Sequence, residues 1–381
     1  MPFARSALIA VLLALSGSGA LARNITSEAW GTTDSGEKVQ LFTLKGGHGL
    51  EARITNYGAR IVNLYVPNGQ GGRTDIELGF DDFQSYYRKP SVYGAVIGRY
   101  VGRIGHGGSF TLDGKHYQLE KTAPNAKFVI HGGTAAFSRK LWSAKMQDGA
   151  EPSLILTLVS PDGDGGFPGK LTTTVTYTLT RDNGLKIDYR AVANDRPTIV
   201  NLTNHSYFAL QGEGNGDVSD QTVQLFADKY TPADADDLET GEILPVDGTP
   251  LDFRKPVRLG DVLHSDFPQI AMRHGLDMNF VVRGKPGTLR PAAILSDPHT
   301  GIVMHVSTTQ PCILLYSDGI GDHTVTGKGG KIYRNFYAMS LETQNYLDSI
   351  NHPTFPSQPS TVIRPGQPLH EVTVFNFSVK K

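Results

Sequence analysis

Cysteine is almost absent from this sequence. Cys312 is the only cysteine in 381 residues, which excludes an intramolecular disulfide and a metal site built from several cysteines. It opens an apolar run that continues to Tyr316, and a thiol in such a run is typical of a buried small hydrophobe rather than a nucleophile. A chain of this length without disulfides must rely on its hydrophobic core for stability.

The sequence also lacks a surplus of charge of either sign. Its 36 Lys and Arg residues nearly balance 37 Asp and Glu residues, for a formal net charge of -1. There is no basic stripe with interleaved aromatic residues, which argues against a nucleic-acid partner. There is no basic amphipathic helix either, so nothing favours binding to a membrane surface. The hydrophobic fraction of 39% is sufficient for a large core.

The apolar run at the N-terminus is too short to span a bilayer comfortably. Arg5 provides a positive charge, residues 7–15 are apolar, and residues 20–22 (Ala-Leu-Ala) fit a small-x-small cleavage site. We therefore predict a signal peptide over residues 1–22, a mature chain that starts at Arg23, and a secreted or periplasmic location with no membrane attachment after cleavage. The alternatives are an uncleaved anchor and a buried N-terminal helix.

Turn residues and period-two alternation are abundant, with 43 Gly and 22 Pro. Residues 171–180 (LTTTVTYTLT) alternate strictly, and residues 185–193 repeat the alternation after the turn Asp-Asn-Gly at 182–184, which predicts a β-hairpin. Residues 23–381 are therefore expected to form one large antiparallel β domain. Further strands are predicted at 154–159, 301–308, 312–316 and 371–379, and one short helix at 81–87.

Three short clusters place titratable groups within strand-like flanks. His131 ends an apolar run before two glycines, His205 lies within VNLTNHSYF, and Glu342 lies within MSLETQ. Taken singly, such histidines are more often hydrogen-bonded core residues than catalysts, and a lone glutamate on a strand usually faces solvent. Asp277 is equally compatible with a turn and Arg103 with a surface charge. The residues alone support a secreted β protein with candidate acid and base groups.

Together these clusters resemble the aldose 1-epimerase (galactose mutarotase) family over nearly all of residues 23–381. The resemblance implies an all-β fold, a large antiparallel β-sandwich of the galactose mutarotase-like supersandwich type, with an open cleft for one monosaccharide. The motifs that carry the resemblance are 56–59 (NYGA), 78–81 (LGFD), 93–99 (YGAVIGR), 112–114 (LDG), 160–163 (SPDG), 166–169 (GFPG), 200–208 (VNLTNHSYF), 341–345 (LETQN), 364–366 (RPG) and 375–378 (FNFS).

The resemblance also implies roles for six residues. Glu342 would be the general base that takes the proton of the anomeric hydroxyl, and His205 would be the general acid that protonates the ring oxygen. Such a pair, on opposite sides of the C1–O5 bond, would open the ring, and rotation about C1–C2 followed by closure would give the other anomer. Neither a metal nor an organic cofactor is implied. The residues that would bind the sugar are Arg103, His131, Asp277 and Gln310.

The sequence departs from the family pattern without touching the acid or the base. The usual Asn-Arg is Gly102-Arg103, and the usual Asp-His-Asn-Phe has Met278 in place of the histidine. Two extra residues precede His131, and the usual Pro-Asp after the glutamate strand is Leu347-Asp348. We expect these changes to affect sugar preference and the shape of one cleft wall.

Other functions remain open on the sequence. An inverting glycoside hydrolase would use Asp277 and Glu342 as carboxylates about 6.5–9.5 Å apart. A carbohydrate-binding relative would lack catalysis, and a relative acting on sugar phosphates would need extra Arg or Lys residues at the cleft mouth. The predicted partner is a small monosaccharide, and the predicted state is a monomer or weak dimer. Asn24-Ile25-Thr26 matches the acceptor pattern for N-linked glycans.

Overall fold

A computed structural model of the chain describes residues 24–89, 91–318, 325–356 and 358–380. The predicted signal peptide, residues 1–22, lies outside the described residues, so its existence stays a prediction. In the described ranges every helix is too short or too polar to traverse a lipid bilayer. The secondary structure is dominated by antiparallel strands, which confirms the all-β fold class.

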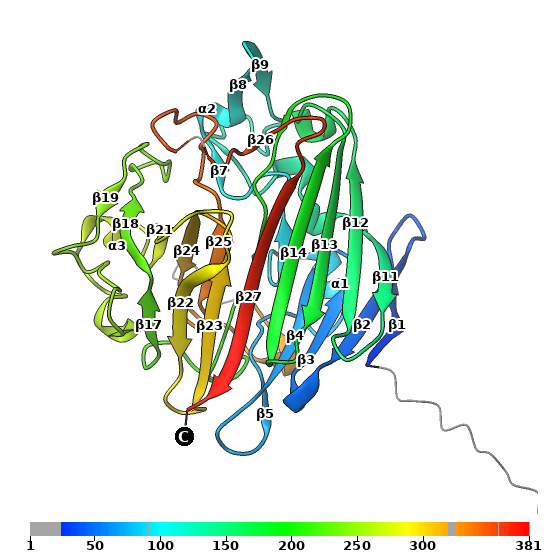
Figure 1. The fold of residues 1–381 in the computed structure, drawn as a ribbon, viewed down its shortest axis with the longest axis vertical. Helices are drawn as coiled ribbons and strands as arrows, with labels where there is room; N and C mark the ends of the chain where they lie inside the picture. Colours follow the sequence, from blue (N-terminus) through cyan, green and yellow to red (C-terminus); the bar gives the residue numbers. More distant parts are fainter. Residues whose placement is uncertain (1–23, 90, 319–324, 357, 381) are drawn as a thin grey trace, which may run out of the picture.

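The broad sheet in Figure 1 has nine strands in the order β11-β12-β13-β14-β27-β23-β22-β17-β20. The predicted hairpin forms its third and fourth strands, where Leu171 of β13 pairs with Ala193 of β14. Buried side chains alternate along β13, because successive side chains of a strand point to opposite faces. The strands are β11 (Ser143–Gln147), β12 (Ser153–Ser160), β13 (Leu171–Leu179), β14 (Gly184–Ala193), β17 (Thr222–Leu225), β20 (Val257–Arg258), β22 (Arg290–Ser296), β23 (Ile302–Thr308) and β27 (Leu369–Val379).

A second sheet packs behind this one and completes the sandwich. Its five strands follow each other in chain order, and in Figure 1 the blue strands of this sheet lie behind the green hairpin. One hydrophobic cluster contains Ile54 and Leu64 from this sheet together with Val175 and Phe375 from the large sheet, so both sheets share a core. The strands are β1 (Ile25–Thr32), β2 (Lys38–Lys45), β3 (Glu51–Thr55), β4 (Arg60–Pro67) and β5 (Arg73–Asp75).

A third sheet and four short ladders position most of the predicted site residues. The sheet has the order β19-β18-β21-β24-β25 and consists of β18 (Ala227–Thr231), β19 (Leu244–Pro245), β21 (Asp277–Val282), β24 (Cys312–Tyr316) and β25 (Ser340–Gln344). The ladders pair β6 (Ala95–Ile97) with β16 (Thr203–His205), β7 (Arg103–Ile104) with β10 (Val129–Ile130), β8 (Ser109–Leu112) with β9 (Lys115–Gln118), and β15 (Thr198–Ile199) with β26 (Val362–Ile363).

The helices are short and lie in the connections. The predicted helix at 81–87 is confirmed as α1 (Phe83–Arg88), and the Asp82 carboxylate caps it by accepting the backbone N–H of Ser85 at 2.9 Å. The other α-helices are α2 (Gly105–Gly108) and α3 (Pro268–Ala271). Single 3-10 turns occur at Gly47–Gly49, Gly133–Ala135, Phe137–Arg139, Asp164–Gly166, Leu259–Asp261 and Lys328–Gly330.

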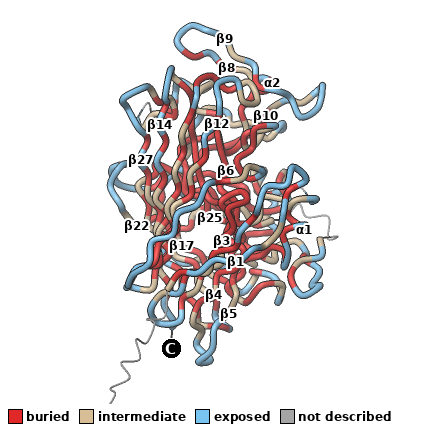
Figure 2. The backbone as a smooth tube through the Cα atoms, turned by 90° about the vertical axis from the view of Figure 1, so that its right-hand side faces the viewer, coloured by how far each residue is buried: buried red, intermediate tan, exposed pale blue. Residues whose placement is uncertain are grey.

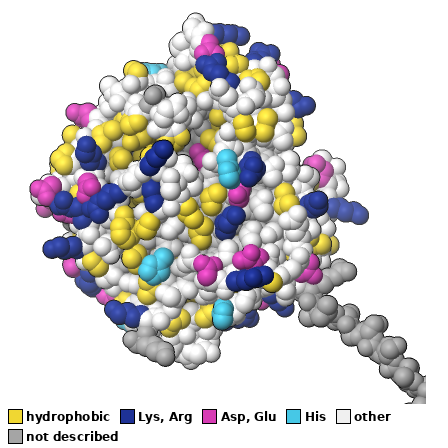
Figure 3. All heavy atoms as spheres, in the orientation of Figure 1, with side chains coloured by type: hydrophobic (Ala, Val, Ile, Leu, Met, Phe, Trp, Pro, Cys, Tyr) yellow, Lys and Arg dark blue, Asp and Glu magenta, His cyan; other side chains and the backbone are white. Residues whose placement is uncertain are grey.

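Burial follows the layers of the sandwich. Figure 2 shows that the strands in the interior of the molecule are buried and that loops at its periphery are exposed. Cys312 is fully buried on β24, and burial raises the pKa of its thiol, which confirms its reading as a packing residue. On the face drawn in Figure 3, basic and acidic side chains are interspersed rather than gathered by sign.

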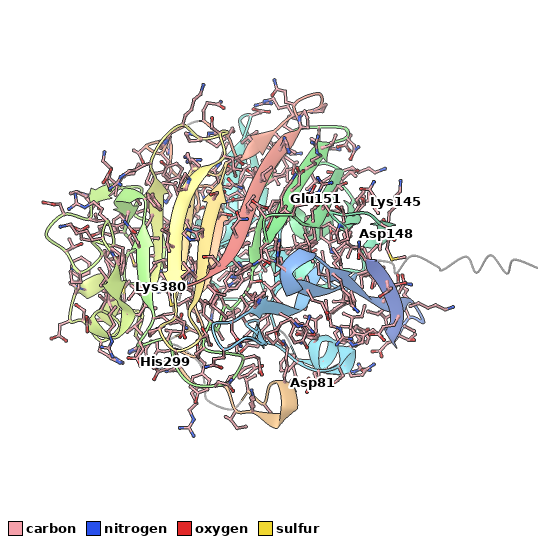
Figure 4. All side chains as sticks on the ribbon, turned by 60° about the horizontal axis from the view of Figure 1, so that its bottom comes forward. Asp81, Lys145, Asp148, Glu151, His299 and Lys380 are labelled. Carbon is pink, nitrogen blue, oxygen red and sulfur yellow. The ribbon has the colours of Figure 1, made fainter. Side chains whose placement is uncertain are left out.

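Asn24, the candidate glycan acceptor, lies at the edge of the molecule next to β11. Its side-chain amide donates to the carbonyl of Gly149 at 2.9 Å, and its backbone N–H donates to the carboxylate of Asp148 at 3.0 Å. Figure 4 labels Asp148 together with Lys145 and Glu151 along this edge. The partly exposed position is compatible with modification, and glycosylation of Asn24 stays a prediction.

Candidate active site

Five of the six predicted site residues line one cavity of about 160 Å³. They come from five separate parts of the chain: Arg103 on β7, His131 after β10, His205 on β16, Asp277 on β21 and Glu342 on β25. Apolar and aromatic side chains form most of the remaining wall. The other lining residues are Val92, Val101, Gly102, Ile130, Tyr207, Leu314, Tyr316, Gln344 and Leu347.

Gln310, the sixth predicted residue, lies elsewhere. It lines a different cavity, together with Glu371. The turn between β23 and β24 holds it there, because its backbone N–H donates to the Thr308 hydroxyl at 3.0 Å and its carbonyl accepts from Arg290 at 2.8 Å. Gln344 contributes an amide side chain to the wall of the first cavity instead.

Strand β25 explains how Glu342 reaches the cavity. All five residues of β25 are buried, so the solvent-facing alternative for Glu342 is wrong. The strand is hydrogen-bonded to β24 on one side, where Glu342 pairs with Leu314, and it contacts β16 as well. Because side chains alternate along a strand, Glu342 and Gln344 share the face that lines the cavity. The same alternation, applied to LETQ, could have identified Gln344 from the sequence.

His205 and Glu342 lie next to each other in the cavity. The His205 Nε2 is 3.4 Å from the Glu342 Oε1, and both side chains are at least 95% buried. The His205 ring stacks on the Tyr207 ring at a centroid distance of 4.9 Å, which fixes its plane. A separation of 3.4 Å leaves no room for a pyranose between the two groups. The pair must instead reach O1 and O5 from one side, since both oxygens are bonded to C1.

Burial decides the resting charges of this pair. It lowers the pKa of His205 well below its ordinary value, and the nearby His131 lowers it further. It raises the pKa of Glu342 well above its ordinary value; Asp277 adds to the increase and Arg103 opposes it. At neutral pH the favoured form therefore combines a neutral imidazole with a protonated carboxyl. This form and the imidazolium–carboxylate form hold the same number of protons, so the pair carries one proton that it can pass on.

The environment of His131 fixes its role as a neutral hydrogen-bond donor. The backbone N–H of Gly102 donates to His131 Nδ1 at 3.2 Å, so in the neutral ring Nε2 carries the hydrogen. Burial, reinforced by Arg103, lowers the pKa of His131 to about 3. His131 has a left-handed φ of 53°, and the following Gly132 packs against the main chain: a Cβ there would lie 2.1 Å from the carbonyl oxygen of Gly98.

Asp277 is held by two arginines, one of which the sequence reading missed. Arg103 Nη1 lies 3.6 Å and Arg273 Nη1 3.0 Å from Asp277 Oδ2. Asp237 lies against both guanidinium groups, 3.2 Å from Arg103 and 3.0 Å from Arg273. Nothing in the local sequence of Arg273 or Asp237 distinguishes them from surface charges. Within the described residues, no group of three His, Cys, Asp or Glu side chains is arranged to hold a metal ion.

Two departures from the family pattern occupy the same space. A Cβ on Gly102, which has a φ of 75°, would lie 2.2 Å from Cδ2 of Leu347. Leu347 lines the cavity at this point, so the glycine makes room for an apolar side chain in the wall. The neighbouring Asp348 accepts the backbone N–H of Gly105 at 3.0 Å and holds the loop that follows Arg103. Met278 is buried and is not among the cavity-lining residues.

Comparisons with known proteins place this cavity in context. The family described as aldose 1-epimerase matches residues 40–376. Galactose mutarotases from Rattus norvegicus and Homo sapiens are each 39% identical over 360 residues, covering 93% of this chain and 99% of theirs. An aldose 1-epimerase of Escherichia coli (strain K12) is 32% identical over 342 residues, covering 90% of this chain and 96% of its own.

Solved structures give the same picture. The galactose 1-epimerase of Lactobacillus acidophilus superposes with a TM-score of 0.81 at 26% identity, covering 94% of this chain and 100% of its own. A GalM/aldose epimerase homologue from C. elegans superposes with a TM-score of 0.79 at 27% identity, covering 89% of this chain and 98% of its own. The sandwich is thus similar to a fold already solved several times.

Proposed function

The chain belongs to the aldose 1-epimerase family and is an isomerase of that kind, and from this premise we propose how its cavity opens and recloses a sugar ring. The substrate we propose is a free aldose such as galactose or glucose. The names of the rat and human relatives, both galactose mutarotases, support galactose. The observation that supports the assignment most is the buried His205–Glu342 pair at 3.4 Å, in a cavity shared with Arg103, His131 and Asp277.

Ring opening in this proposal moves two protons. The step starts from the imidazolium–carboxylate form of the pair, in which the shared proton has passed from Glu342 to His205. The Glu342 carboxylate then takes the proton of the O1 hydroxyl, the C1–O1 bond becomes a carbonyl, the C1–O5 bond breaks, and O5 takes the proton of the His205 imidazolium. The pair ends as a neutral imidazole and a protonated carboxyl, the form that burial favours. The open-chain aldehyde turns about C1–C2 and the reverse transfers close the ring on the other face of the carbonyl.

The other cavity residues suit the binding of a polyhydroxylated ring. The Nε2–H of His131 and the guanidinium of Arg103 can donate to sugar oxygens, and the carboxylate of Asp277 can accept from hydroxyls. Leu314 and Leu347 offer apolar contact to C–H groups of the ring. The proposed substrate contacts are therefore Arg103, His131 and Asp277; Gln310 stays a prediction from the resemblance, since it lines another cavity.

Polarimetry tests the proposal directly. Freshly dissolved α-galactose and α-glucose should reach their equilibrium rotation much faster with the protein than without it. Release of reducing sugar from oligosaccharides, measured in parallel, tests the hydrolase alternative that would use Asp277 and Glu342. Hydrolysis without faster mutarotation would contradict the mechanism proposed here.

We further propose that the chain is exported through a signal peptide at residues 1–22. Support comes from Arg5, the apolar run and the Ala-Leu-Ala site in the sequence. Mass spectrometry of the protein recovered from its native host should find a mature N-terminus at Arg23. The proposed state in solution is a monomer or weak dimer, which light scattering coupled to size-exclusion chromatography would test.

A further inference from the structure

Two arginines and two aspartates form a closed ring of ion pairs at the cavity. Arg103 lies between Asp277 and Asp237, with Nη1 3.6 Å from the first carboxylate and Nη2 3.2 Å from the second. Arg273 joins the same two carboxylates, with Nη1 3.0 Å from Asp277 and Nε 3.0 Å from Asp237. Arg103 and Asp277 line the cavity, while Asp237 and Arg273 form the outer half of the ring.

We propose that Asp237 and Arg273 are positioning residues for sugar binding: they hold Arg103 and Asp277 in place without touching the sugar. The inference rests on the proposed function of the cavity. It assigns to two residues outside the cavity wall a share of the affinity for an aldose.

Arg273 is so deeply buried that its charge needs both carboxylates, those of Asp277 and Asp237. Only 5% of its surface is exposed, and a buried guanidinium is costly unless carboxylates and hydrogen bonds compensate for lost water. The Nη1 of Arg273 also donates to the main-chain carbonyl of Asp277. Arg273 therefore fixes both the backbone and the carboxylate of Asp277, which is the first residue of β21.

Asp237 is held in place by its own turn. It has a left-handed φ of 64°, and its backbone N–H donates to the carbonyl of Asp234 at 3.0 Å. The same loop is bound to α3, because the side chain of Gln269 accepts from the N–H of Ala233 at 2.9 Å and donates to its carbonyl at 2.8 Å. The segments that carry Asp237 and Arg273 are thus joined by neutral hydrogen bonds as well as by the ion pair.

The arrangement leaves Asp277 ready to accept from a sugar. Both arginines approach its Oδ2. Among the described residues no hydrogen bond reaches Oδ1, and in this proposal Oδ1 accepts from a sugar hydroxyl group. Asp237 holds the other terminal nitrogen of Arg103, Nη2. The Arg103 guanidinium therefore cannot turn fully towards Asp277. Without Asp237, Arg103 is free to pair more closely with Asp277, which would compete with the sugar for both partners.

A double-mutant cycle tests the ring as one unit. Asp237→Asn and Arg273→Gln each remove one charge; the first keeps the side-chain volume, and the second shortens the side chain. We expect each change to raise KM for galactose about tenfold with kcat changed less than about twofold, because the ring acts in binding rather than in proton transfer. The double variant should be no worse than the more affected single variant, since either change already opens the ring.

A matched control distinguishes the ring from ion pairs in general. Arg283 directly follows β21 and pairs with Asp228 on the same sheet, with Nε 2.8 Å from Oδ2. Arg283→Gln should leave KM unchanged. Arg273→Lys keeps the charge but cannot span both carboxylates, so it should raise KM to an intermediate value. Asp237 is about one-third exposed in its side chain, so Asp237→Asn should fold even if Arg273→Gln does not.

Calorimetric titration of galactose into the same variants keeps turnover and binding apart. A tenfold rise in Kd for Asp237→Asn and a smaller rise for Arg273→Lys, with Arg283→Gln unchanged, would support the ring even if the wild-type protein did not accelerate mutarotation. That absence of acceleration would contradict only the proposed function. Unchanged Kd and KM in both ring variants would overturn the inference. So would a double variant whose effects multiply, or a loss confined to kcat.

Discussion

Replacing Glu342 by glutamine separates the chemistry of the cavity from its packing. An amide of the same shape cannot take the O1 proton, so mutarotation should slow by about 10²- to 10⁴-fold, equivalent to about 3–5 kcal/mol of transition-state stabilisation. The fold should be retained or strengthened. Burial raises the pKa of Glu342 above its ordinary value. As pH rises from the ordinary pKa towards the folded-state pKa, the carboxyl ionises in the unfolded chain but stays protonated in the folded one. The wild-type protein therefore loses stability in this window, and the amide variant does not share that loss.

The assay pairs polarimetric rates with urea unfolding at pH 6 and pH 9. Glu371→Gln is the matched control, since Glu371 is also buried, with a pKa raised to about 8 by burial, and lies outside the cavity. It should keep wild-type turnover. A Glu342→Gln variant with wild-type rates would refute Glu342 as the base. An equal loss of activity in Glu371→Gln would show that removal of any buried carboxyl, rather than the base, explains the effect.

Other outcomes follow from the same structure. His205→Asn should lower kcat at least about 10²-fold with a smaller change in KM; a change in KM alone would make His205 a binding residue. The pH profile of kcat/KM should be bell-shaped, because burial lowers the pKa of His205 and raises that of Glu342. Its acid limb should lie below the ordinary pKa of histidine and its alkaline limb above the ordinary pKa of glutamate. Limbs at the ordinary pKa values of the two residues would contradict these shifts. The folded-state pKa of Glu371, about 8, lies above its ordinary value. The contribution of Glu371 to stability is therefore present at pH 4 and is lost as pH rises to 8, by up to about 1.4 kcal/mol per pH unit. Glu371→Gln should flatten the pH dependence of the free energy of unfolding in this range. Gly132→Ala should cost at least about 2 kcal/mol of stability, since its φ is 86° and a Cβ would meet a main-chain carbonyl; an unchanged urea midpoint would contradict the packing described.

Local alternation in the sequence was enough to predict much of the fold. The hairpin of β13 and β14 and the strands β12, β23, β24 and β27 follow from period-two patterns and turn residues, because one face of each strand must be buried. Helix α1 (Phe83–Arg88) corresponds to the short helix predicted at 81–87. The resemblance carried by motifs such as VNLTNHSYF and LETQN identified the family, and it led to the prediction of His205 as the acid and Glu342 as the base.

The tertiary structure alone decided how the site is assembled. Glu342 is buried because β25 lies between β24 and β16, a contact between segments far apart in the chain that no local pattern encodes. The tertiary structure also placed Gln310 with Glu371 in another cavity and made space for Leu347 beside Gly102. It closed the ring of ion pairs through Asp237 and Arg273. Alternation along a strand tells which side chains share a face, whereas the distance between two faces depends on how the whole sandwich packs.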